Sequence, residues 1–162
     1  MEIRKANKKD FGKLLELIIQ NTKYNIKLDK MTLKPQKLNW ESLEEIKKTE
    51  SEELKKDFRN SKKKIFVAVL EEKIIGFIKI SFLGKNPYIK TKRGEIDELF
   101  VLEDYRKKGI GKALIKKGFF LFKSKEIKLI SISVISNNIP TLKIYEKLGF
   151  KESVKRMNLK LK

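Results

Sequence analysis

The alternation of strand and helix patterns in the C-terminal half most strongly limits the fold of this chain. A strand pattern over 95–102 leads through a short basic turn into the helical apolar spacing of 109–122. Alternating apolar residues over 128–135 predict another strand, and 138–148 predict a second helix with Gly149 as its C′ residue. Strands that alternate with helices in this way indicate an α/β fold, a mixed sheet with helices packed against it.

The first half of the chain adds a hairpin and two helical regions. The elements predicted there are strands over 2–5, 64–70 and 74–83, a helix over 11–19 with Asn7 as its cap, and one or two short helices over 40–58. Residues 71–73 are expected to form the hairpin turn, whereas 28–35 and 84–94 are expected to be irregular. The last twelve residues, 151–162, can hold one more strand. Because the chain has no internal repeat and no flexible Gly/Ser linker, we expect a single domain over 1–162.

The absence of cysteine and histidine removes much enzyme chemistry. Without cysteine there is no disulfide and no thiolate nucleophile, and without histidine there is no imidazole base and no Ser-His-Asp triad. An ordinary zinc site also lacks its usual ligands, so no metal is expected. Any catalysis must use carboxylates, hydroxyls, phenols, lysines and backbone amides.

The net charge of +19, from 40 basic and 21 acidic residues, favours polyanions as partners in principle. Only 5 of the basic residues are arginines, although arginine is the side chain that reads DNA and phosphate with a bidentate fork. A basic module that binds nucleic acid or regulates, without catalysis, is therefore the alternative to an enzyme and is not favoured.

The N-terminal residues are polar, and the first apolar stretch is short and interrupted by Glu16. Such a stretch is too short for a signal peptide or a membrane span. We therefore expect a cytoplasmic protein with no membrane partner, either a monomer or a homodimer.

The turn before the helix at 109–122 has the features of a phosphate site. Amides at a helix start have no partner within the helix and face the positive end of its dipole. Gly109 and Gly111 let a ligand approach the backbone closely. The basic side chains around them are Arg106, Lys107, Lys108 and Lys112. Such a turn can hold a pyrophosphate. It is neither a P-loop nor a dinucleotide fingerprint, since Leu114 stands where a third glycine would fall, and a plain lysine-rich turn is the alternative.

A second motif follows the next strand, because Asn138, Tyr145, Gly149 and Phe150 have the spacing Asn-x6-Tyr-x3-Gly-Phe. Together with the preceding Arg-x-x-Gly-x-Gly turn, this order of elements resembles the GNAT superfamily of N-acetyltransferases, which use acetyl-coenzyme A as co-substrate. The resemblance implies a mixed, mostly antiparallel central sheet with helices on both faces. It also implies acceptor-side helices over about 7–58 and an acetyl-CoA-binding core over about 64–152.

The resemblance further implies roles for individual residues. In the family, the glycine turn holds the pyrophosphate of coenzyme A, the strand before it pairs with the pantetheine arm, and an asparagine lies beside that arm. The residues implied to bind the cofactor are Leu99, Phe100, Val101, Arg106, Lys107, Lys108, Gly109, Ile110, Gly111, Lys112 and Asn138. Asn138 can alternatively serve only as a helix cap.

Tyr145 is implied as the general acid that protonates the departing thiolate. A phenol with a pKa of about 10 can donate to a thiolate whose thiol has a pKa of about 8.5. Because Tyr145 shares a helix face with Leu142 and Leu148, a purely structural role in the core is the alternative.

The general base is left open by the sequence. Some family members use a glutamate eleven residues before the first residue of the turn, which is Glu95 here. Others use a carboxylate twelve residues before the tyrosine, where this chain has Ser133, which cannot act as a base at neutral pH. Asp97, Glu98 and a water relay are alternatives. Strand alternation is expected to place Asp97 opposite to Glu98 and on the same side as Glu95.

The acceptor is expected to be a primary amine of a small molecule or a peptide, and to be cationic. Two short segments are rich in acids: Glu95, Asp97, Glu98, Glu103 and Asp104, and then Glu41, Glu44, Glu45, Glu50, Glu52 and Glu53. In the family the second of these regions borders the acceptor site, so the resemblance implies that both segments converge and attract a cation despite the global charge. The alternative is that these acids only balance neighbouring lysines.

Overall fold

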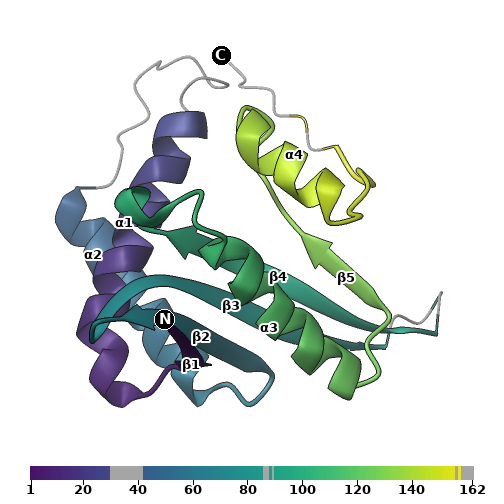
Figure 1. Ribbon diagram of the computed structural model, residues 1–162, viewed down its shortest axis with the longest axis horizontal. Coiled ribbons are helices and arrows are strands. Elements are labelled where there is room, and N and C mark those ends of the chain that lie inside the picture. Colours follow the sequence, from purple (N-terminus) through teal and green to yellow (C-terminus); the bar gives the residue numbers. More distant parts are fainter. Residues whose placement is uncertain (30–41, 86–87, 89, 156, 158–162) are drawn as a thin grey trace.

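Five strands form one sheet in the spatial order β1-β2-β3-β4-β5 in the computed structural model, which describes residues 1–29, 42–85, 88, 90–155 and 157 (Figure 1). The strands are β1 (Glu2–Lys5), β2 (Lys63–Leu70), β3 (Lys73–Lys85), β4 (Lys92–Val101) and β5 (Leu129–Ile132). The first four strands pair antiparallel with their neighbours, whereas β5 pairs parallel with β4. The predicted α/β fold with a mixed, mostly antiparallel sheet is confirmed.

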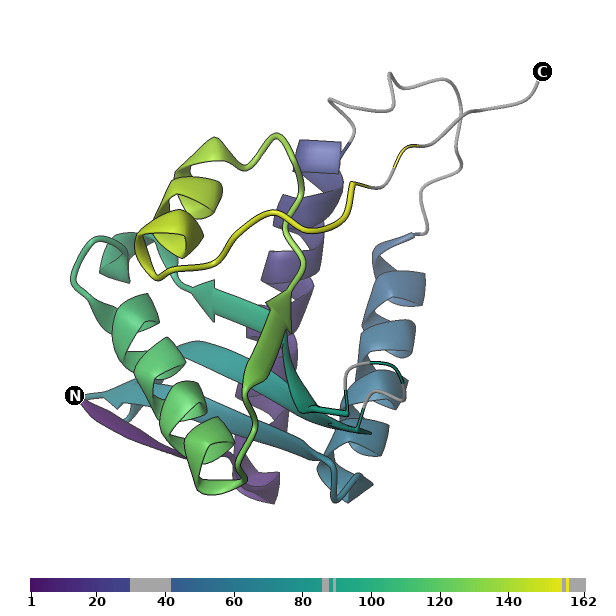
Figure 2. The same ribbon diagram turned by 90° about the vertical axis from the view of Figure 1, so that its right-hand side faces the viewer.

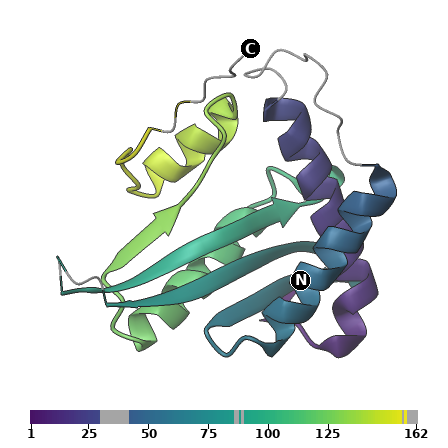
Figure 3. The ribbon, with the colours of Figure 1, turned by 180° about the vertical axis from the view of Figure 1, so that it is seen from behind.

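Helices cover both faces of this sheet. They are α1 (Phe11–Asp29), α2 (Leu43–Arg59), α3 (Ile110–Ser124) and α4 (Ile139–Lys147), together with the short 3-10 helices η1 (Lys8–Asp10) and η2 (Glu103–Tyr105). α3 lies on the face turned toward the viewer in Figure 1, and α1 and α2 lie side by side on the opposite face in Figure 3. α4 follows β5 and lies beyond the edge of the sheet (Figure 2).

The two-residue period of the strands divides the core between these faces. Ile78 and Ile80 of β3 pack under α3, whereas Phe77, the residue before Ile78, packs under α1 and α2. Gly118 permits the close approach of α3, since a Cβ built there would lie 3.4 Å from Ile78 Cδ1 and 3.5 Å from Ile80 Cγ2. The sheet therefore has one apolar surface for the α3 side and another for the α1/α2 side.

The β2–β3 hairpin is confirmed and uses a tight turn. Leu70 pairs with Lys73, so only Glu71 and Glu72 lie between the strands. Both have positive φ, 49° and 63°, which is the backbone of a type I′ turn. Glycine or asparagine usually occupies such positions, so the two glutamates here adopt an uncommon conformation to keep the strands in register.

Several predicted boundaries were wrong. α1 continues through Leu28 and Asp29, which were expected to be irregular. The region predicted as one or two short helices forms one helix, α2, which is not short but 17 residues long. The predicted loop over 84–94 is shorter, because the antiparallel ladder continues through Gly84–Arg93 and Lys85–Lys92 pairs. β5 ends at Ile132 and not at 135. Residues 151–155 and 157 form no strand, and the other residues of the predicted last strand lie outside the described part of the chain.

Candidate functional site

β5 separates from β4 half-way along the sheet. The two strands pair only from Arg93–Leu129 to Ile96–Ile132, whereas β4 continues to Val101 with β3 as its partner. In Figure 2 and Figure 3, β5 accordingly runs away from β4 toward α4. The second half of β4 therefore has a backbone edge that β5 does not cover.

The register determines which backbone groups face this edge. Leu102 donates its N–H to Ile75 O at 2.9 Å, which turns the backbone of Leu102 toward β3. Because backbone direction alternates along an antiparallel strand, Phe100 also faces β3, and Leu99 and Val101 face away from it. Of the three strand residues expected to meet the cofactor, Leu99 and Val101 thus present backbone groups at the open edge. The Phe100 side chain lies in the α1/α2-side core.

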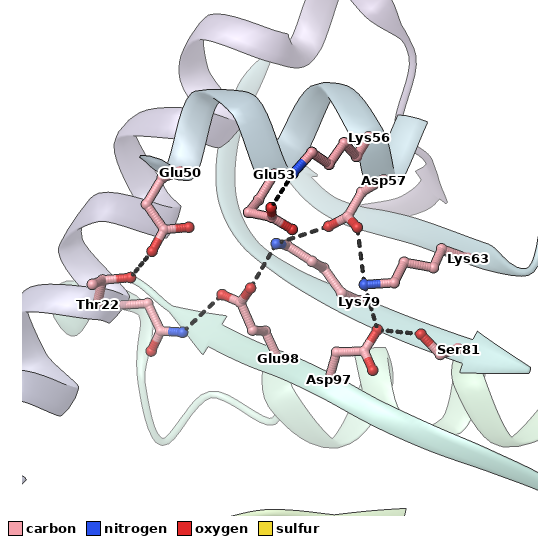
Figure 4. Close-up of polar contacts among 11 residues, drawn as sticks. Thr22, Glu50, Glu53, Lys56, Asp57, Lys63, Lys79, Ser81, Asp97 and Glu98 are labelled. Atoms are coloured by element: carbon pink, nitrogen blue, oxygen red, sulfur yellow. Dashed lines mark hydrogen bonds and ion pairs between the residues drawn. The ribbon is translucent and has the colours of Figure 1, made fainter. Parts of the chain in front are cut away.

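A β-bulge lies where β5 leaves β4. Glu98 pairs with Lys79 and Ile96 pairs with Ile80, so Asp97 has no partner in β3. The side chains of Asp97 and Glu98 consequently join one polar network on the α1/α2 side of the sheet (Figure 4). The prediction that Asp97 lies opposite to Glu98 was wrong, because it assumed a regular strand.

The basic turn lies at the start of α3, next to the end of β4. Gly109 is the N-cap residue with a φ of 79°, and it offers no side chain to the first amides of the helix. A Cβ at Gly111 would meet only Val101 Cγ2, at 3.9 Å. The backbone of this helix start is therefore open to a ligand, and this geometry fits a pyrophosphate.

The side chains around this turn differ in their directions. Lys107, Lys108 and Lys112 are exposed, whereas Ile110 is buried in the core under the sheet and can offer only its backbone. The Arg106 guanidinium does not extend freely into solvent: its Nε donates to Val101 O at 3.0 Å. The same group lies 5.3 Å from the centre of the Tyr24 ring of α1. Arg106 therefore joins the turn to β4 and α1.

Asn138 and Tyr145 lie at opposite ends of α4. Asn138 is 9% exposed, and its side-chain oxygen accepts a hydrogen bond from Thr141 N at 3.4 Å, so it caps the helix. Tyr145 is 8% exposed and belongs to the α3-side core. Within the described part of the chain the Tyr145 hydroxyl makes no hydrogen bond, and burial raises the pKa of this phenol to about 12. Tyr145 is thus a core residue with an unpaired proton donor.

The acids of the two predicted segments are spread over different surroundings. Glu45 accepts the backbone N–H of Ser42 and so caps α2, while Glu44 is exposed beside it. Glu50 accepts a hydrogen bond from Thr22 of α1 at 2.6 Å, and burial raises the pKa of the Glu50 carboxyl. Of the other members, Glu52 and Glu53 are exposed on α2, where Glu53 pairs with Lys56, and Glu103 and Asp104 are exposed in η2. Glu41 lies outside the described residues.

Sequence reasoning missed Lys79, which lies at the centre of the polar network in Figure 4. Its side chain points to the α1/α2 side and pairs with Asp57 of α2 and Glu98 of β4. A lysine within the apolar run 74–80 was the available signal, because a charged residue in a buried strand needs a partner.

Residues 33–150 match the model of the acetyltransferase (GNAT) family. The chain belongs to the GNAT family. An N-alpha-acetyltransferase of Sulfurisphaera tokodaii is 33% identical to this GNAT chain over 94 residues, which make up 54% of this chain and 56% of that relative. The chain thus spans about half the length of such curated relatives.

Solved structures share the GNAT fold with this chain. A protein described as a transcriptional regulator from Bacillus halodurans has a TM-score of 0.74 at 20% identity, with 99% of both chains covered. An aminoglycoside acetyltransferase from an uncultured soil metagenomic sample has a TM-score of 0.67 at 22% identity, with 99% of this chain and 96% of that chain covered. None of the helices described in this GNAT chain has the length and apolar character needed to cross a membrane.

Proposed function

We propose that this chain transfers an acetyl group from acetyl-CoA to a primary amine by direct attack of the amine on the thioester carbonyl. The observation that carries the proposal is the position of the open β4 edge at Leu99 and Val101 directly before the glycine-containing start of α3. An extended acyl-thioester arm can pair with this edge while its pyrophosphate lies on the helix amides. Membership of the GNAT family supports the same pairing of edge and turn.

In the proposed reaction, a C–N bond forms to the amine and the C–S bond of the thioester breaks. Holding the two reactants together supplies much of the acceleration. The N–H of Leu99 or Val101 at the open edge would donate to the carbonyl oxygen as negative charge develops there. The amine proton would leave to a base, and the departing sulfur would receive a proton.

For the proton donor we propose Tyr145. A pKa of about 12 keeps its phenol protonated at neutral pH, so the donor is present throughout the cycle. Since the thiol of the leaving group has a pKa of about 8.5, complete transfer from this phenol is uphill. The proposed role is therefore a hydrogen bond that stabilises the thiolate, and the thiolate then takes its proton from solvent.

For the base we propose Glu95, which lies on the same side of the sheet as Asp97 and Glu98. Asp97 accepts a hydrogen bond from Ser81, and Glu98 pairs with Lys79. Glu95 makes no ion pair and no side-chain hydrogen bond within the described part of the chain, so its oxygens are available to accept the amine proton. A water between Glu95 and the amine is compatible with this role.

For the acceptor we propose a cationic amine. Glu50 and Glu98 lie on the α1/α2 side, where their carboxylates repel each other enough to help raise the pKa of Glu50. A positively charged acceptor near Glu95 would relieve this repulsion. The family includes a structure of an aminoglycoside acetyltransferase, and aminoglycosides carry several amines.

The proposal is tested by release of free thiol from acetyl-CoA in the presence of polyamines, basic peptides and neutral amines. Turnover with at least one amine supports it. The competing function, a nucleic-acid-binding or regulatory module, is separated by the melting temperature at high salt, where attraction between the basic chain and polyanions is screened. If saturating acetyl-CoA does not raise the melting temperature, and if no amine gives turnover, the proposal that the chain is an enzyme is rejected.

A further inference from the structure

Lys79 is a charged residue in the interior of the sheet. It is 4% exposed, and its Nζ lies 3.1 Å from Asp57 Oδ2 and 2.6 Å from Glu98 Oε1. Burial alone would lower the Lys79 pKa, but the Glu98 and Asp57 carboxylates outweigh it and hold that pKa above its ordinary value. The ammonium is thus kept charged between a helix and a strand that are distant in the sequence.

The same network also holds the neighbouring bulge residue. Asp57 Oδ1 lies 2.9 Å from Lys63 Nζ, and Lys63 Nζ lies 3.8 Å from Asp97 Oδ2. Ser81 Oγ donates to Asp97 Oδ2 at 2.5 Å (Figure 4). One chain of contacts therefore holds both Asp97 and Glu98. In a regular strand, the side chains of two such consecutive residues would point to opposite faces of the sheet.

A β3–β4 pairing without the bulge would place Asp97 in apolar surroundings. If the β3–β4 pairing continued without a bulge, Asp97 would lie opposite Ile80, whose side chain belongs to the apolar α3-side core. The bulge instead places Ile96 opposite Ile80 and turns Asp97 toward Ser81 and Lys63. It occurs at the residue after Ile96, where the pairing with β5 ends.

We propose that Lys79 is a positioning residue for acetyl transfer: with Asp57 and Glu98 it fixes the β4 bulge, and the bulge sets how Leu99 and Val101 face the open edge. This inference rests on the proposed function, because it assigns the use of that edge to the thioester. Lys79 itself does not touch the reacting atoms. It acts through Glu98, which is two residues from Phe100 and adjacent to Leu99.

The test uses the paired variant Lys79→Met/Asp57→Asn, which keeps the net charge and leaves every proposed substrate contact in place. We expect kcat to fall at least about tenfold, while the dissociation constant of acetyl-CoA changes by less than about threefold because the α3 turn is untouched. We also expect faster exchange of the Phe100 amide, which the register places against Phe77. The pH profile of kcat should keep its shape, since no proposed acid or base is removed.

A matched control is Arg4→Met/Asp10→Asn, which removes another ion pair with a buried aspartate. This pair joins β1 to η1, with Arg4 Nη1 2.7 Å from Asp10 Oδ2. This control should lose stability but keep kcat within about twofold of the wild-type value. Equal effects of the two paired variants on kcat would overturn the proposal, and so would an unchanged kcat in both.

If Lys79→Met/Asp57→Asn does not fold, the proposal is tested with Ser81→Ala, because this variant removes only the hydrogen bond to Asp97. A fall of about threefold or more in kcat with faster Phe100 exchange supports the proposal, and no change in either overturns it. If the wild-type protein shows no turnover with any amine, the proposed function fails. The exchange of Phe100 then still decides whether the network holds the bulge.

Discussion

The ring of Phe150 meets the ring of Tyr145 edge-on, with the centroids 5.8 Å apart and an interplanar angle of 61°. Phe150 N also donates to Tyr145 O at 3.0 Å, and Gly149 N donates to Glu146 O at 2.9 Å. With a φ of 92° at Gly149, these contacts form a Schellman motif at the end of α4. The motif that ends the helix therefore also holds the phenol ring, and leaves its hydroxyl without a hydrogen bond inside the described protein.

Tyr145→Phe tests the role of this hydroxyl, because the ring contact with Phe150 and the backbone motif are retained. We expect kcat to fall at least tenfold, a loss of about 1.4 kcal/mol of transition-state stabilisation. The affinity for acetyl-CoA should stay nearly the same, as measured by calorimetry on the wild-type protein and the variant. Equal turnover of the two proteins would leave Tyr145 as a core residue only.

The titration of Tyr145 gives an independent check. Its pKa is raised by burial from an ordinary value of about 10 to about 12, so the folded state favours the neutral phenol. The resulting contribution to stability is complete below about pH 10 and is lost as the pH rises from about 10 to about 12. The difference in tyrosinate absorbance between wild type and Tyr145→Phe isolates this group. A midpoint at the ordinary value would show that the phenol is not buried.

The local parts of the site could be predicted from the sequence, whereas the β4 bulge could not. The Arg-x-x-Gly-x-Gly turn and the Asn138 cap are local, so their residue types alone place them at helix starts. The bulge at Asp97 depends on contacts from other elements. One of these joins Asn21 of α1 to Glu98 at 3.2 Å across 77 residues, and no local pattern contains such a pairing.

The boundaries show the same limit. Gly84 was predicted to begin an irregular segment, but its pairing with Arg93 continues the ladder. The extent of β5 also depends on a partner: it ends at Ile132, where β4 bulges, although the alternating pattern continues beyond that residue. Tertiary pairing, and not intrinsic preference, sets these ends.

Gly111→Glu tests the phosphate site at the start of α3. A Cβ there meets only Val101 Cγ2 at 3.9 Å, so the protein should fold. The added carboxylate would occupy the space proposed for the pyrophosphate and would repel its negative charge. We expect loss of acetyl-CoA binding in calorimetry. Gly12→Glu is the matched control, since Gly12 is an exposed glycine of α1 with no atom within 4 Å of a built Cβ. Wild-type affinity in Gly111→Glu would refute the assignment.

The Arg4–Asp10 pair predicts a specific acid dependence of stability. The hydrogen bond from Arg4 lowers the pKa of Asp10, although burial opposes the shift. A depressed folded-state pKa stabilises the protein above the ordinary value of about 4, and this contribution is lost as the pH falls through the lower folded value. The difference in unfolding free energy between wild type and Arg4→Met should therefore be full at pH 6 and shrink below about pH 4. A difference that does not change with pH would contradict the pairing.

The proposed cationic acceptor is tested with Glu44→Gln/Glu50→Gln. These residues of α2 are chosen because Glu45 caps the helix and Glu95 is the proposed base, so substituting either would change more than charge. We expect the KM for a polyamine to rise by about threefold or more while the KM for a neutral amine stays within about twofold, because only a cation gains from local negative potential.

The matched control for this prediction is Glu2→Gln/Glu126→Gln, which changes the net charge by the same amount outside α2. It should leave the ratio of the two KM values unchanged, since its carboxylates lie on β1 and after α3. The preference should also weaken at high salt in the wild-type protein, because exposed charges are screened beyond about 10 Å at 0.1 M. An equal rise in KM for both acceptors in Glu44→Gln/Glu50→Gln would contradict the proposal that the acceptor is recognised by its charge.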